Sequence, residues 1–235
     1  SGGAENVSAR VSLNYNDQET ISRGTDFQKY GFRSSVDYEL GDLLEVNLNN
    51  GLTGIRKTSL GGFSNVPLPP NLSPYDDDGS FNDASIFQDR PNPLAVIEQN
   101  DNNHNSLATT NSLQIGTEPI ENLNLRALGG IDYYQNRNFI YRSMKNATGD
   151  NNGGGLTIIN RRNRKWITNL TGDYSYQMNA NHAFSGLAGV EAQEKNTKIL
   201  RGSGNNFLND ELRVLQAASG RDDRDAASSD DNVTT

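Results

Sequence analysis

Residues 7–16 read VSARVSLNYN, and an apolar or aromatic side chain occupies every second position, from Val7 to Tyr15. Polar side chains fill the positions between them. Because successive side chains of a strand point to opposite faces, this alternation predicts a β-strand with one apolar and one polar face. The pattern returns in residues 30–40 and 44–53. The chain therefore begins with three predicted strands.

Four later runs follow the same rule with more interruptions, namely residues 107–117, 123–133, 166–176 and 184–192. Seven strands are thus predicted. Runs of about 11 residues are roughly twice as long as the average strand of a soluble sheet, and long enough to cross a bilayer at a tilt. Their length favours a membrane β-barrel over a soluble sandwich.

The composition narrows the class further. Of the 235 residues, 33% are hydrophobic, none is Cys, and the formal net charge is −8. No apolar run approaches the roughly 20 residues of a membrane-spanning helix. The lack of Cys excludes disulfides, thiol catalysis and Cys-based zinc sites, and the acidic balance argues against a nucleic-acid or anionic-lipid partner.

The connections between the predicted strands alternate in size after the first hairpin. Tight turns are expected at residues 41–42, 118–122 and 178–181, and long polar connections at 59–105, 143–162 and from 196 onward. Short turns at one end and long loops at the other are typical of outer-membrane barrels, whose loops lie outside the cell. Aromatic residues near both strand ends are expected to form interfacial girdles, among them Tyr15, Trp166, Tyr38 and Tyr174.

Several short segments then resemble a known family. Residues 12–19 (SLNYNDQE), 25–33 (TDFQKYGFR) and 44–49 (LEVNLN) look like the early barrel of SusC/RagA-type TonB-dependent transporters, in matching order and spacing. Residues 74–80 with 92–95 are similar to a long external loop of that family, and 181–191 to a later strand.

The resemblance implies an all-β fold, a partial antiparallel transmembrane β-barrel of about seven long strands from a 22-stranded type of barrel. It also implies nutrient import across the bacterial outer membrane, with oligosaccharides or peptides as substrates. The implied partners are a SusD-like surface lipoprotein, outer-membrane lipid and the TonB complex, which would act through parts absent from this chain.

Seven strands cannot close such a barrel, and the chain starts at Ser1 without a Met, so we expect an internal fragment. Residues 1–198 would form the barrel segment and 199–235 an external loop region. Leu208, Leu212 and Leu215 follow helical spacing, which predicts a short helix over 208–218 capped by Asn209 or Asp210. We expect poor order beyond residue 220.

Because side chains alternate between the two faces of a strand, six charged residues are assigned to the polar face. There they are expected to line the lumen or contact a plug. They are Arg10, Lys29, Arg33, Asp37, Glu39 and Glu45. In the external loops the candidate ligand contacts are Tyr75, Asp76, Asp78, Phe81 and His104. A solvated turn is favoured over a calcium site at the acidic run, so no metal and no cofactor are predicted. Phe81, Phe87 and Tyr141 could stack on a sugar ring, although anchoring the loops is the favoured role.

No catalytic arrangement is evident. His104 and His182 are the two histidines, neither is paired with a nucleophile in sequence, and the glycines at 153–155 lead into a strand rather than a helix. An enzyme is therefore not predicted. Two alternatives remain open at this point, a siderophore or vitamin receptor of the TonB-dependent type and a soluble secreted glycan-binding β-sandwich or adhesin module.

Overall fold

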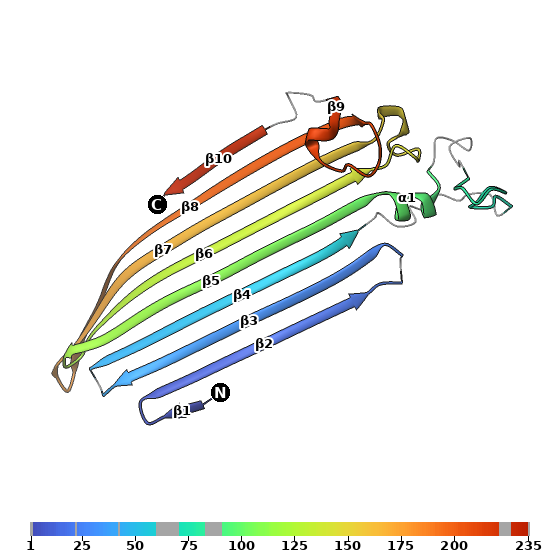
Figure 1. The fold of residues 1–235 in the computed structure, drawn as a ribbon. Coiled ribbons are helices and arrows are strands. Elements are labelled where there is room, and N and C mark those ends of the chain that lie inside the picture. Colours follow the sequence, from blue (N-terminus) through green and yellow to red (C-terminus); the bar gives the residue numbers. More distant parts are fainter. Residues whose placement is uncertain are drawn as a thin grey trace.

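The computed structural model describes residues 2–21, 23–41, 43–59, 71–82, 91–220 and 227–234. Within them, ten strands form one antiparallel sheet (Figure 1). The strands are β1 (Gly2–Ala4), β2 (Val7–Glu19), β3 (Thr25–Leu40), β4 (Leu44–Ser59), β5 (Asp101–Ile120), β6 (Leu123–Arg142), β7 (Gly155–Asn179), β8 (His182–Phe207), β9 (Ala218–Gly220) and β10 (Ala227–Thr234).

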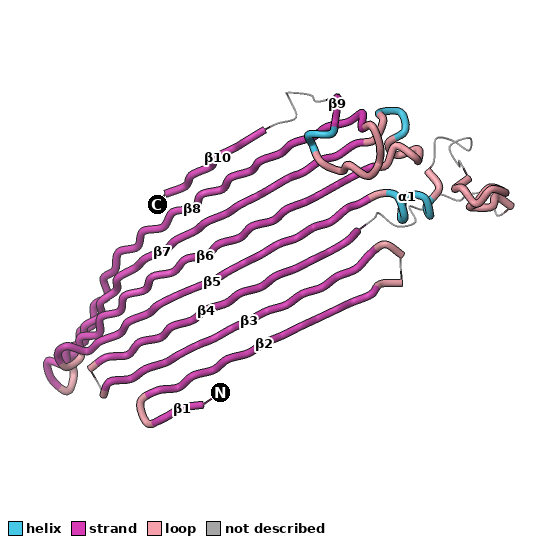
Figure 2. Tube along the Cα trace, in the orientation of Figure 1, coloured by secondary structure: helices cyan, strands magenta, loops and turns pink. Residues whose placement is uncertain are grey.

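The sheet is a meander in which each of β1 to β8 pairs with the next strand in sequence, while β10 and the short β9 both pair with β8. Tight turns join the strands at one end, called here the turn end, and the longer connections gather at the other, the loop end (Figure 2). At the loop end lie helix α1 (Pro93–Gln99) and the single 3-10 turns η2 (Asp150–Asn152) and η3 (Leu215–Ala217). Among the helices that the structure describes, none is long and apolar enough to cross a membrane.

The seven predicted strands are confirmed as β2 to β8, with lengths from 13 to 26 residues. The register keeps the predicted faces aligned across the sheet: Leu13 stands opposite Phe32, and Phe32 opposite Leu52. We call this side the apolar face and the other side the polar face. The apolar face continues through Leu113, Ile115, Ala127, Ile131, Trp166, Leu170, Tyr174 and Val190.

On β3 and on β7, two aromatic residues of the apolar face are separated by the same number of positions. Tyr30 and Tyr38 are eight residues apart on β3, and Trp166 and Tyr174 are eight apart on β7. Eight residues of strand measure about 27 Å, or about 22 Å across a sheet tilted by about 35°, close to the apolar band of roughly 25 Å in outer-membrane barrels.

The tilt itself follows from the register. The row of paired residues through Tyr30 reaches Arg162 on β7, which is four residues closer to the loop end than Trp166. The row through Tyr38 reaches Leu170, four residues from Tyr174. A shift of four residues over four strand spacings is a slope of about 35°. Membrane barrels tilt their strands by about 35–45°, and the slope between these aromatic residues lies at the lower end of that range.

Four expectations at the loop end are wrong. The connections are shorter than 59–105 and 143–162, because β5 begins at Asp101 and β7 at Gly155. The helix expected over 208–218 is absent: residues 215–217 form one 3-10 turn. Residues 227–234, expected to be poorly ordered, form strand β10, and β8 runs without a break through the expected boundary at residue 198.

Candidate functional site: the polar face and the loop cluster

The six charged residues predicted to share a face do so. Arg10 stands opposite Ser35, in the same row as Asn49, and Asp37 opposite Asn47 and Ser8, whose hydroxyl donates to the Asp37 carboxylate at 3.2 Å. Lys29, Arg33 and Glu39 follow on β3 at the same parity, and Glu45 faces Glu39 across β3 and β4. That this face lines a lumen stays a prediction.

A second part of the polar face was not selected from the sequence. A hollow of about 660 Å³ lies over β5 to β8, lined among others by Asp132, Tyr134, Asn163, Lys165 and Lys195. Lys165 stands directly opposite Lys195, with Asp132 on its other side. Strand alternation placed Asp132 and Lys165 on the polar side, but the register that brings two lysines together cannot be read from a single strand.

Four of the loop candidates form a small hairpin. Tyr75 pairs with Phe81, and their rings lie 5.3 Å apart. The Asp78 carboxylate accepts hydrogen bonds from the Ser80 hydroxyl at 2.7 Å and the Ser80 amide at 2.9 Å, which lower the pKa of Asp78. Asp76 contributes backbone groups to the turn. Asp78 thus engages its own turn, and across the described residues no three acidic or His side chains gather into a possible metal site.

His104, expected in a loop, lies instead within β5. Its Nδ1 is 2.8 Å from the side-chain oxygen of Asn138 on β6, and it stands opposite Lys57 on β4. It therefore belongs to the polar face near the loop end, separate from the hairpin that carries Tyr75 and Phe81. The structure does not bring the five loop candidates into one site.

Among the residues that the structure describes, the most buried polar contacts surround Asp210. Its carboxylate is 7% exposed and accepts hydrogen bonds from the Tyr141 hydroxyl at 2.6 Å, the Ser143 hydroxyl at 2.7 Å and the Met144 amide at 3.1 Å. Burial alone would favour the neutral acid, but these donors outweigh it and lower the pKa of Asp210. Burial and the Asp210 hydrogen bond raise the pKa of Tyr141, whose hydroxyl therefore remains a donor.

Arg213 joins this group to two further segments. Its guanidinium lies 4.6 Å from the centre of the Tyr141 ring, forms a salt bridge with Asp101, and donates to the Gln99 carbonyl at 3.2 Å. The Asn100 side chain accepts from the Ser143 amide at 2.7 Å. Together with the packing of Tyr141 against Leu156, Phe207 and Ala218, these contacts define the loop cluster.

The loop cluster was missed from the sequence, apart from the favoured role of Tyr141. That residue is fully buried, so it anchors the loops and offers no face to a sugar ring. Phe87, the other aromatic considered for stacking, lies outside the described residues. The sequence pattern predicts only a helix-capping role for Asp210. The three groups that donate hydrogen bonds to its carboxylate are 66 to 69 residues away in sequence.

Long antiparallel strands, one apolar face bounded by aromatic residues, and connections packed at one end define part of the wall of a transmembrane β-barrel. Within the described residues this sheet is not closed. The comparisons with known proteins agree with this class, although no family model matches the chain.

The sequence is 29% identical over 216 residues to TonB-dependent receptor P26 of Formosa agariphila, covering 89% of this chain and 22% of that receptor. The fold is similar to the structure of the RagAB peptide transporter, with a TM-score of 0.76 and 21% identity over 100% of this chain and 28% of that one. The RagAB peptide importer in its closed-closed state gives a TM-score of 0.74, 19% identity and coverage of 100% and 27%. The chain thus spans about a quarter of these relatives, and its resemblance to part of a SusC/RagA-type TonB-dependent transporter is confirmed.

Proposed function

We propose that this chain is part of the barrel of a TonB-dependent importer in the bacterial outer membrane. The apolar face would contact lipid, the polar face would line the interior, and the loop end would lie outside the cell. The observation that supports this orientation most directly is the apolar band, whose two aromatic boundaries run parallel at the slope of a barrel wall.

The proposed substrates are peptides or oligosaccharides. The polar face carries amide and hydroxyl side chains such as Asn47, Asn49, Ser112 and Gln114, which can exchange hydrogen bonds with a hydrated polymer. The similarity to a peptide transporter makes peptides the first class to test. A SusD-like lipoprotein and the TonB complex are the proposed partners, the latter through segments outside these residues. A siderophore or vitamin receptor is the second candidate within the same class.

A soluble sandwich receives less support. A sandwich needs a second sheet on the apolar face, yet Leu13 is 80% exposed and Val11 60% exposed, and no other described element covers them. Lipid is the environment that would bury such side chains.

The face assignment can be tested by labelling, because the chain contains no Cys. In the intact protein in its membrane, Ser12→Cys should react with a water-soluble maleimide, whereas its neighbour Val11→Cys should resist it and be quenched by lipid-borne spin labels. Equal reactivity at both positions would contradict the assignment.

Transport is tested in cells that lack the gene and carry it back on a plasmid. Uptake of fluorescent oligopeptides and of oligosaccharides should return with the gene and stop when an uncoupler removes the proton gradient. Recovery of the protein in the soluble fraction would reject the proposed function. Uptake that continues at the same rate in the presence of the uncoupler would also reject it. Uptake of a siderophore alone would favour the second candidate.

A further inference from the structure

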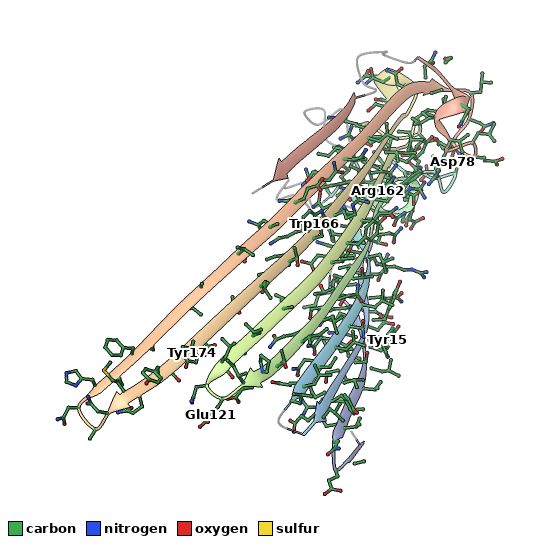
Figure 3. All side chains as sticks on the ribbon, turned by 90° about the vertical axis from the view of Figure 1, so that its left-hand side faces the viewer. Tyr15, Asp78, Glu121, Arg162, Trp166 and Tyr174 are labelled. Atoms are coloured by element: carbon green, nitrogen blue, oxygen red, sulfur yellow. The ribbon has the colours of Figure 1, made fainter. Side chains whose placement is uncertain are left out.

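Beyond the aromatic boundary, the apolar face becomes basic. On β7, Arg164 and Arg162 follow Trp166 toward the loop end on the same face (Figure 3 labels Arg162 and Trp166). On β6, Arg137 stands opposite Asn160, one two-residue step beyond Arg162. All three arginines are exposed. Diagonal neighbours on adjacent strands, such as Arg137 and Arg162, are about 7–8 Å apart in a sheet. The three arginines form what we call the arginine patch.

The register sets the height of the arginine patch above the aromatic boundary at Trp166. Arg164 and Arg162 lie two and four residues from Trp166. With about 3.4 Å per residue and the tilt of about 35°, they stand about 6 and 11 Å above the tryptophan. Aromatic girdles mark the level of the lipid headgroups, so the patch lies where headgroup phosphates are found.

The patch has no acidic partner among the described side chains. None of its three arginines forms a salt bridge with a described residue. The nearest acidic residue on β8, Glu194, is opposite Trp166 and accepts a hydrogen bond from its ring nitrogen at 2.9 Å. The residues directly opposite the three arginines carry no negative charge: Asn105, Tyr133, Gln135, Asn160, Asn196 and Lys198.

The basic character does not extend to the first two long strands of the sheet. On β2 and β3, the positions just beyond Tyr15 and Tyr30 on the same face are Asp17, Gln28 and Asp26. Two further cations lie on the same face, Arg56 on β4, in the row of Arg137, and Lys198 on β8, directly opposite Arg162; the name arginine patch is kept for the three arginines of β6 and β7. Neighbouring like charges on one face repel each other, and a bound anion would relieve that repulsion.

We propose that Arg137, Arg162 and Arg164 bind the phosphorylated headgroup of a glycolipid in the outer leaflet. Guanidinium groups pair with phosphate through two parallel N–H donors, which fits phosphate better than a single ammonium would. Gln135 lies between them and accepts from the Tyr133 hydroxyl at 2.8 Å, which leaves its NH2 group available as a further donor. The site rests on the proposed function, since that places this face in lipid.

The test compares two triple variants of the intact protein, both purified in detergent from the outer-membrane fraction. The first is R137Q/R162Q/R164Q. The matched control removes three cations from the polar face of the same two strands, R126Q/R161Q/K165Q. Binding of bisphosphorylated lipid A, of the same lipid without phosphates, and of inorganic phosphate is measured, together with the lipid that co-purifies, by native mass spectrometry.

We expect the patch variant to bind bisphosphorylated lipid A at least about tenfold more weakly than the unchanged protein, which corresponds to about 1.4 kcal/mol. The control should stay within about twofold. The dephosphorylated lipid should bind weakly to all three proteins, and the patch variant should carry less co-purified lipid.

Unchanged binding in the patch variant, an equal loss in the control, or equal binding of the dephosphorylated lipid would each overturn the proposal. Binding of inorganic phosphate as tight as that of the lipid would assign the site to free phosphate instead. Failure of the proposed function gives a separate result, because the protein would then be missing from the outer-membrane fraction before any lipid is added.

Discussion

The sheet and the loop cluster differ in where their side chains are buried. Apart from glycines, the buried residues that the structure describes all lie at the loop end, including Tyr141 at 0% and Leu156 at 1% exposure. Between the aromatic boundaries, the apolar face carries large hydrophobic side chains that are half or more exposed, such as Leu13 and Val11. The loop cluster packs on itself, while the sheet offers its apolar side chains outward.

This difference shows that the two regions have different sources of stability. The cluster is held by buried hydrogen bonds and ring contacts within the chain. Within the sheet, the inner strands satisfy their backbone hydrogen bonds between neighbours, but the apolar side chains gain nothing until lipid or another apolar surface covers them. The membrane therefore acts on the sheet as a core does in a soluble protein, and each region should respond to a different kind of change.

The largest effect is expected from a charge on the apolar face. Leu48 lies near the middle of the band, opposite Val36 and Leu113. Leu48→Arg should cost about 2–4 kcal/mol of unfolding free energy, as cations do near the bilayer midplane. Chemical unfolding in lipid vesicles measures this free energy. The fluorescence of Trp166, the chain's one tryptophan, follows the unfolding of the sheet.

Its matched control is Asn47→Arg, one residue along β4 on the polar face, opposite Asp37. That change should stay within about 0.5 kcal/mol, as is usual for substitutions away from a core. Equal losses for Leu48→Arg and Asn47→Arg would remove the distinction between the two faces and the dependence of the sheet on lipid.

A smaller and more local effect is expected in the loop cluster. Asp210→Asn replaces an acceptor by an amide donor where Tyr141, Ser143 and Met144 all donate. An unsatisfied buried donor costs about 1–3 kcal/mol. Hydrogen exchange should show faster opening at the Met144 amide, with the sheet amides unchanged. Glu211→Gln, at the exposed neighbouring position, should leave exchange unaltered, and slower or unchanged exchange in Asp210→Asn would contradict the role given to this carboxylate.

The same carboxylate predicts a pH dependence confined to the loop cluster. Its pKa in the folded chain is lower than in the unfolded chain, where Asp titrates near 3.9. Its contribution is therefore complete above about pH 4 and is lost as the pH falls through the folded value. Exchange at Met144, corrected for the intrinsic rate, should speed up in acid. A similar acid response in Asp210→Asn would show that another group is responsible.

The sheet could be predicted because alternation is a local property. Val7 to Tyr15 show their two faces without any knowledge of neighbouring strands, and the six charged residues on the polar face follow from the same parity. The aromatic residues at the strand ends were also predicted from the sequence. Their common slope follows from the register between β3 and β7, and alternation within single strands does not determine that register.

The loop end could not be predicted because its contacts join residues distant in sequence, such as Arg213 and Asp101, which are 112 positions apart. The helical spacing over 208–218 gave a wrong prediction because Leu208 and Leu212 remain exposed. A helix there would have no buried apolar face to stabilise it. Strand β10 has no clear apolar alternation. It forms because the edge of β8 offers unpaired backbone groups, for which an extended segment of any composition is a partner.

The smallest expected effect concerns the polar face, where Lys165 and Lys195 stand directly opposite each other. Like charges at such a position cost about 0.2–1 kcal/mol relative to a neutral pair, and a partner of opposite sign recovers a similar amount. Lys195→Glu should therefore raise the unfolding free energy in vesicles by several tenths of a kcal/mol, and less at high salt. Lys29→Glu, whose cross-strand neighbours are Asn16 and Ile55, provides the control and should give no gain. A destabilised Lys195→Glu would mean that an anionic group already lies between the two lysines in the intact protein, and that the polar face, like the apolar one, is completed by something outside this chain.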